Sequence, residues 1–159
     1  MPETCGLRLH FRPLILMDSG HTFNPNLDKL EAKGIQLAAF EIGNEINWAA
    51  FKGEVPVPGQ GKIFGLDDLS HDPEAQQIAK GFLQYLKILA VVKDVRDHSE
   101  LNQHTPIISS GLAMEDLPPG PSPNPTADAV SSTVTIQFLR AHGLDNFVDA
   151  YGIHKDDSC

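Results

Sequence analysis

The stretch AAFEIGNEINWAAF, residues 38–51, decides how the rest of the chain is interpreted. Its apolar beginning is typical of a buried strand, which we place over residues 37–43, and an amide and a carboxylate, Asn44 and Glu45, follow at once. Because side chains alternate along a strand, we expect Glu41 and Glu45 on one side and the apolar residues on the other. A buried ionised carboxylate is costly without a partner, and the sequence does not identify a partner for Glu41.

Composition and charge exclude several classes of function. The chain has 159 residues, 41% of them hydrophobic, which is enough for one packed domain. Twelve Lys and Arg residues against 21 Asp and Glu residues give a net charge of −9, which argues against a nucleic-acid partner. Cys5 and Cys159 form no C-x-x-C pair, so we expect no metal site and no redox cofactor.

The sequence does not indicate a compartment or a membrane anchor. No apolar run approaches the ~20 residues that a membrane-spanning helix needs. The N-terminal stretch lacks the charged, apolar and small-residue layout of a signal peptide, since Arg12 and Pro13 interrupt its apolar run. Localisation therefore stays unassigned, and we expect no membrane partner.

Strand and helix patterns alternate along the chain. Strand patterns are expected at 14–17, 37–43, 106–110 and 146–153. Helix patterns begin near residues 24, 72 and 126 and end near residues 33, 97 and 142. We expect the Gly- and Pro-rich segments 52–71 and 116–125 to be loops.

The ends of the helices have recognisable residues. For the first helix we expect Asn24 as the N-cap, Pro25 at the first helical position and Gly34 in a left-handed conformation after the last turn. Asp72 and Pro73 open the longest helix. These residues define the predicted boundaries.

The alternation of strands and helices predicts an α/β fold with parallel strands and right-handed helical crossovers. A complete (β/α)₈ barrel needs roughly 250 residues, so the count favours a partial TIM barrel of about four βα units. A small doubly wound, flavodoxin-like sheet is the alternative, although no Gly-x-Gly-x-x-Gly follows the first strand. The longest loops follow strands, which in a barrel is the functional end.

Two motifs resemble one enzyme family. FEIGNEIN, residues 40–47, resembles the fourth-strand motif of the clan A glycoside hydrolases, the retaining (β/α)₈ glycosidases, in which an Asn-Glu pair closes the strand. VDAYGIHK, residues 148–155, resembles their sixth strand, where an Asp precedes a His by five positions. The resemblance makes residues 1–159 a single incomplete catalytic-domain segment that covers about strands three to six.

The resemblance implies roles for named residues. In the family, the Glu of the motif is the general acid/base and the Asn binds the sugar 2-hydroxyl, so these roles fall on Glu45 and Asn44. A retaining mechanism also needs a second carboxylate about 5–5.5 Å away as the nucleophile. In the family that carboxylate closes the seventh strand. Asp156 and Asp157 lie in the wrong unit, and the resemblance assigns the nucleophile to no residue here.

Two further residues are candidates for substrate contact. Trp48 is either a platform on which a sugar ring stacks or a packing residue of the barrel rim. His154 either contacts substrate or is an ordinary histidine at a strand end. The implied function is cleavage of O-glycosidic bonds in β-linked carbohydrate, without cofactor or metal, with no turnover expected from this segment alone. The alternatives are a catalytically dead fragment and a flavodoxin-like binding domain.

The partial barrel also predicts how the chain behaves in solution. Four strands leave two open sheet edges where a barrel would close, and unpaired edges favour association. We therefore expect self-association through these edges.

Overall fold

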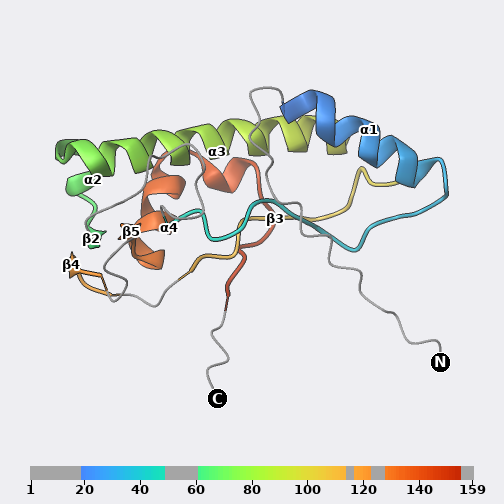
Figure 1. Ribbon diagram of the computed structural model, residues 1–159. Coiled ribbons are helices and arrows are strands. Elements are labelled where there is room, and N and C mark those ends of the chain that lie inside the picture. Colours follow the sequence, from blue (N-terminus) through green and yellow to red (C-terminus); the bar gives the residue numbers. More distant parts are fainter. Residues whose placement is uncertain (1–18, 49–60, 114–116, 123–127, 155–159) are drawn as a thin grey trace, which may run out of the picture.

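The computed structural model describes residues 19–48, 61–113, 117–122 and 128–154, which form an α/β structure with parallel strand pairs (Figure 1). One sheet pairs β1 with β3 in parallel, and the other has the order β4-β2-β5, with β2 antiparallel to β4 and parallel to β5. The strands are β1 Phe40–Glu41, β2 Lys62–Phe64, β3 Ile107–Ile108, β4 Gly120–Pro121 and β5 Ala129–Val130. The predicted α/β class is therefore confirmed at this level, while the described residues do not form a closed barrel.

The described helices differ greatly in length. They are α1 Ser19–Glu31, α2 Asp68–His71, α3 Pro73–Asp97 and α4 Ser132–Ala141, and a 3₁₀ turn, η2, covers Leu144–Asn146. Figure 1 shows α1 and α3 side by side along one side of β1 and β3. Within the described residues, none of the helices has both the length and the apolar character that crossing a bilayer requires.

The long helix α3 is confirmed as predicted over residues 73–97. The side chain of Asp72 accepts hydrogen bonds from the backbone N–H groups of Glu74 (2.8 Å) and Ala75 (3.2 Å), and Pro73 occupies the first helical position. Buried residues recur every three or four positions along one face, as an amphipathic helix requires. They include Ile78, Phe82, Leu86 and Leu89.

A single core joins the strands to the helices. Phe40 of β1 and Ile107 of β3 are register partners, and both are buried in one cluster with residues of α1, α3 and α4. Glu41 and Ile108, the next pair along, are only partly buried. Because side chains alternate along a strand, the helices cover one face of this sheet and Glu41 faces the other.

A third segment extends this sheet in parallel. Ile108 bridges Ala150, Leu112 bridges Ile153, and the Ser109 N–H donates to the Ala150 carbonyl at 3.0 Å. The spatial order is therefore β1, β3 and then the segment 150–153, which is also the order along the chain. All three run in the same direction, so their carboxyl ends meet at one edge.

The first helix begins earlier than predicted. The prediction that Asn24 is the N-cap and Pro25 the first helical residue is wrong, because α1 starts at Ser19 and contains Pro25. A proline removes one backbone donor, which lowers stability but does not forbid a helix. Gly34 has φ +70°, which confirms the predicted left-handed position after the helix. The predicted strand at 14–17 lies outside the described residues.

Three other predictions of loop and helix need correction. The predicted loop 52–71 contains β2 and α2 in its described part. The predicted loop 116–125 contains β4. Pro121 is tolerated there because β4 is an edge strand, where a missing donor breaks no ladder. The helix predicted from residue 126 starts at Ser132, since residues 129–130 pair with β2 as β5 instead.

The predicted strand 146–153 is present only in part. Residue 146 still belongs to the 3₁₀ turn η2, and only Ala150 and Ile153 make ladder bridges. The Asp149 carboxylate accepts from the Ile107 N–H at 2.8 Å and from Arg96 Nη1 at 3.2 Å. These side-chain bonds add to the backbone bonds that the N–H groups of Asp149 (2.8 Å) and Ala150 (3.3 Å) donate to the Ile107 carbonyl where the segment enters the sheet.

Tyr85 of α3 holds the ends of β1 and β3 together. Its hydroxyl donates to the Ile42 carbonyl at 2.9 Å and accepts from the Ser110 N–H at 2.8 Å. The side chain is buried, and this burial raises the pKa of the phenol, partly offset by the bond from Ser110 and reinforced by the charge of Glu41. The hydroxyl is therefore neutral, and it satisfies two backbone groups at once.

Replacing this hydroxyl should destabilise the fold. Tyr85→Phe leaves a buried carbonyl and a buried N–H without partners, so we expect a loss of about 1–3 kcal/mol in the free energy of unfolding. Chemical denaturation measures it. Tyr151→Phe is the matched control, because the Tyr151 hydroxyl donates to Asp145 at an exposed position and its loss should have a much smaller effect. Equal losses in the two variants would contradict the bridging role.

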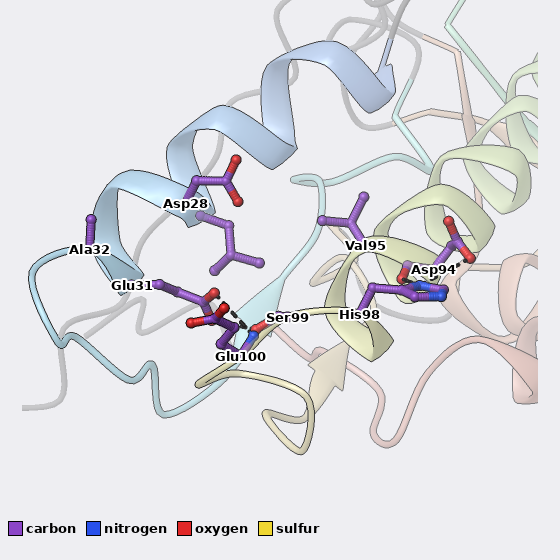
Figure 2. Close-up of a pocket in the computed structure, with 9 residues that line it drawn as sticks. Asp28, Glu31, Ala32, Asp94, Val95, His98, Ser99 and Glu100 are labelled. Carbon is purple, nitrogen blue, oxygen red and sulfur yellow. Dashed lines mark hydrogen bonds and ion pairs between the residues drawn. The ribbon is translucent and has the colours of Figure 1, made fainter.

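Glu31 joins the end of α1 to the loop that follows α3. It lines a pocket of about 690 Å³ between the two helices. Figure 2 shows its carboxylate directed at Ser99. The carboxylate accepts from the Ser99 hydroxyl, from Asn102 Nδ2 at 2.8 Å and from the N–H groups of residues 100–102. Burial alone would raise the pKa of Glu31, but these hydrogen bonds to the charged form outweigh it and lower the pKa to about 2.

This lowered pKa predicts an acid-sensitive contribution to stability. The pKa of Glu31 falls from 4.5 to about 2 on folding, so its stabilising effect is complete above pH 4.5 and is lost as the pH falls towards 2. Glu31→Gln should therefore be less stable than the native chain at neutral pH, and the difference should shrink in acid. Urea denaturation across this pH range measures it, with Glu100→Gln as the exposed control. A constant difference at all pH values would contradict the assignment.

Candidate active site

The turn after β1 carries Glu45 in a strained conformation. Glu45 has φ +47°, and it is the one non-glycine residue with positive φ in the described part of the chain. Residues other than glycine, asparagine and aspartate seldom adopt this left-handed region. The Glu45 N–H donates to the Gly111 carbonyl at 2.8 Å, and the Trp48 N–H donates to the Glu45 carbonyl at 3.0 Å. The turn is thus tied to the end of β3, which holds Glu45 in place.

His154 lies between two carboxylates. Its Nδ1 is 3.2 Å from Glu45 Oε1 and its Nε2 is 3.6 Å from Glu41 Oε1. The exposed fractions of the three side chains are 29% for His154, 22% for Glu45 and 17% for Glu41. Glu45 and His154 therefore meet at one end of the sheet, although 109 positions separate them. His154 is also the partner of Glu41 that the sequence did not identify.

Two glycines make this approach of strands possible. A Cβ atom on Gly111 would lie 2.1 Å from His154 Cδ2, and one on Gly152 would lie 2.4 Å from the Ser109 carbonyl oxygen. Neither distance is compatible with a side chain. The imidazole of His154 therefore packs directly against the Gly111 backbone, and this contact fixes the distance of the imidazole from the strand ends.

The other two predicted site residues lie in the same turn. Asn44 is partly buried, and its side chain makes no hydrogen bond within the described residues, so its amide is available to a ligand. Trp48 is partly buried and its backbone bridges Ala129, at the junction of the two sheets. A sugar-binding role for either residue stays a prediction.

Asn47 is a residue that the sequence did not single out. It is fully buried, and its Nδ2 donates to the carbonyls of Val130 (2.9 Å) and Ala113, while its Oδ1 accepts from the Ala113 N–H at 2.8 Å. These bonds join the turn after β1 to the chain beyond β3 and to β5. The sequence signal is slight, since one amide among apolar and turn residues is ordinary. Asn47 supports the turn that carries Glu45.

This arrangement is suited to proton transfer. A partly buried carboxyl within hydrogen-bonding distance of an imidazole is a common general acid or base. The described residues contain no group of three or more His, Cys, Asp and Glu side chains placed to hold a metal ion. The chemistry that these side chains themselves offer is the donation and acceptance of protons.

Comparison with protein-family models, with curated proteins and with solved structures found no match for this chain. The family resemblance therefore rests on the two sequence motifs, and membership of the family stays a prediction.

The strain at Glu45 predicts an unusual order of stability among variants. Glu45→Ala and Glu45→Asn both remove the carboxylate, but asparagine tolerates the left-handed conformation better than alanine does. We expect Glu45→Asn to be more stable than Glu45→Ala by about 1 kcal/mol in the free energy of unfolding. Thermal and chemical denaturation measure the difference. Equal stability would mean that the left-handed backbone at this position carries no strain.

Proposed function

We propose that this chain is a segment of a retaining glycosidase that acts on β-linked carbohydrate, with Glu45 as the general acid/base. One observation carries the proposal. Glu45 closes a parallel strand in a strained turn, and His154, from the strand segment two places along the sheet, lies 3.2 Å from its carboxylate. Residues with a strained backbone often lie at functional sites, and residues at the carboxyl ends of strands form the active sites of βα barrels.

The placement of the helices favours a partial TIM barrel over a doubly wound sheet, and the strand order is consistent with a barrel. The order β1, β3 and 150–153 follows the chain, as neighbouring strands of a barrel do. A flavodoxin-like sheet also has three neighbouring strands in chain order, but it carries helices on both of its faces. The helices α1, α3 and α4 share one core on one face of the sheet, which suits the outer ring of a barrel. The opposite face, with Glu41 and Ile108, would then be the barrel interior.

The site residues divide into roles by their chemistry. Glu45 would protonate the departing glycosidic oxygen and later take a proton from the attacking water. The free amide of Asn44 would bind the sugar 2-hydroxyl, while His154 and Trp48 would contact the sugar ring. No residue of this chain is assigned as the nucleophile, and without one the covalent glycosyl intermediate cannot form. This segment alone is therefore proposed to have no glycosidase turnover, and its open sheet edges to favour self-association.

The test compares aryl glycosides with good and poor leaving groups. We expect no hydrolysis of either by residues 1–159 alone. In a longer protein that contains these residues and supplies the nucleophile, Glu45→Ala should slow poor leaving groups about 10²–10⁴-fold, because these need protonation in the transition state. Activated aryl glycosides should still release the aglycone, and added azide should restore the second step.

Glu100→Gln serves as the control for a change of charge at an exposed position and should leave both rates unchanged. An equal loss on both substrates in Glu45→Ala, with no rescue by azide, would remove Glu45 from the acid/base role. The family assignment of the site would then fail with it.

A further inference from the structure

We propose that Glu41 is a positioning residue for Glu45, and that it acts through His154. The general acid/base role of Glu45 comes from the proposed function, while the positioning itself concerns only these three side chains. Glu41 lies on β1, four positions before Glu45, and both carboxylates contact the same imidazole. No family motif quoted above gives Glu41 a role.

The imidazole offers one nitrogen to each carboxylate. Nδ1 faces Glu45 at 3.2 Å and Nε2 faces Glu41 at 3.6 Å. Each carboxylate acts on the same ring from its own side, so the charge at Glu41 helps to set where the ring lies. A change of charge at Glu41 would therefore reach Glu45 through the ring, with no contact between the two carboxylates required.

Of the two carboxylates that contact His154, the Glu41 carboxylate is held more firmly in position. It belongs to β1 and pairs in register with Ile108 of β3, and its side chain is the least exposed of the three at 17%. Glu45 lies in a turn with a left-handed backbone. Groups carried by regular strands are held more accurately than groups carried by turns. The strand residue therefore orients the histidine, and the histidine orients the turn residue.

The contact between Glu41 and His154 depends on charge. At 3.6 Å it is too long for a hydrogen bond, so the Glu41 carboxylate acts on the imidazole through its charge and not through a directed bond. The other groups near the cluster do not replace this attraction. The hydroxyl of Tyr85 is neutral, because burial and the charge of Glu41 raise its pKa, and it bonds backbone groups of Ile42 and Ser110 instead of His154. Asp149 and Arg96 lie at the opposite end of the strands. Glu41→Gln keeps the shape of the side chain and should still release the ring.

The position of the ring can be measured directly by NMR. Because the His154 ring lies against Gly111, its Hδ2 proton should give a strong NOE to the Gly111 Hα protons. We expect this NOE to be lost in Glu41→Gln while the backbone amide spectrum stays that of the folded chain. Glu100→Gln removes an exposed carboxylate and should leave the NOE unchanged.

Each outcome decides the proposal. An unchanged NOE in Glu41→Gln would overturn it and would assign the ring position to Glu45 and Gly111 alone. If Glu41→Gln does not fold, the NOE is read in Glu41→Asp, whose carboxylate is withdrawn by one methylene. A weaker NOE there supports the proposal, and an unchanged one overturns it. The NOE requires no glycosidase activity, so failure of the proposed function leaves this test readable.

Discussion

The hydroxyl of Tyr85 is the contact on which the rest of the structure depends. One buried oxygen bonds the Ile42 carbonyl and the Ser110 N–H, so a helix side chain completes the pairing of two strands where their own ladder stops. Without this bond two polar backbone groups would be buried without partners, which is among the costlier defects in a core. The bond also sets the separation of the strand ends, and this separation determines where the next residues of each strand lie.

The candidate site follows from that separation. Beyond Ile42 the chain turns, and the Glu45 N–H donates to the Gly111 carbonyl. The buried side chain of Asn47 also stabilises this turn, because it accepts a hydrogen bond from the Ala113 N–H. Beyond Ser110, Gly111 leaves space for the imidazole of His154. Polar side chains thus gather at the carboxyl ends of the strands, on the side that the helices do not cover. The same arrangement that makes the site accessible also leaves apolar residues exposed nearby, such as Ile153 at 85%.

Stability and the candidate function make different demands on the acidic side chains. Glu31 receives hydrogen bonds from several donors, which lower its pKa and hold a loop in place. Glu45 receives few such bonds and sits in a backbone conformation that other residues would adopt more easily. A carboxylate saturated by donors is suited to a structural role, whereas a partly exposed carboxylate next to an imidazole is suited to proton transfer.

Local features of the chain were readable from the sequence, and contacts between distant segments were not. The residues Asp72 and Pro73, with the apolar repeat that follows, determined α3, because capping and helical periodicity act within a few positions. Alternation along residues 40–42 likewise placed Phe40 in the core and Glu41 opposite it. The strands β2, β4 and β5 were missed because each has only two or three residues and exists through pairing with remote partners. The contact of His154 with Glu41, the burial of Asn47 and the left-handed turn at Glu45 were decided by the tertiary structure alone, since each depends on backbone segments that meet only after the strands have paired.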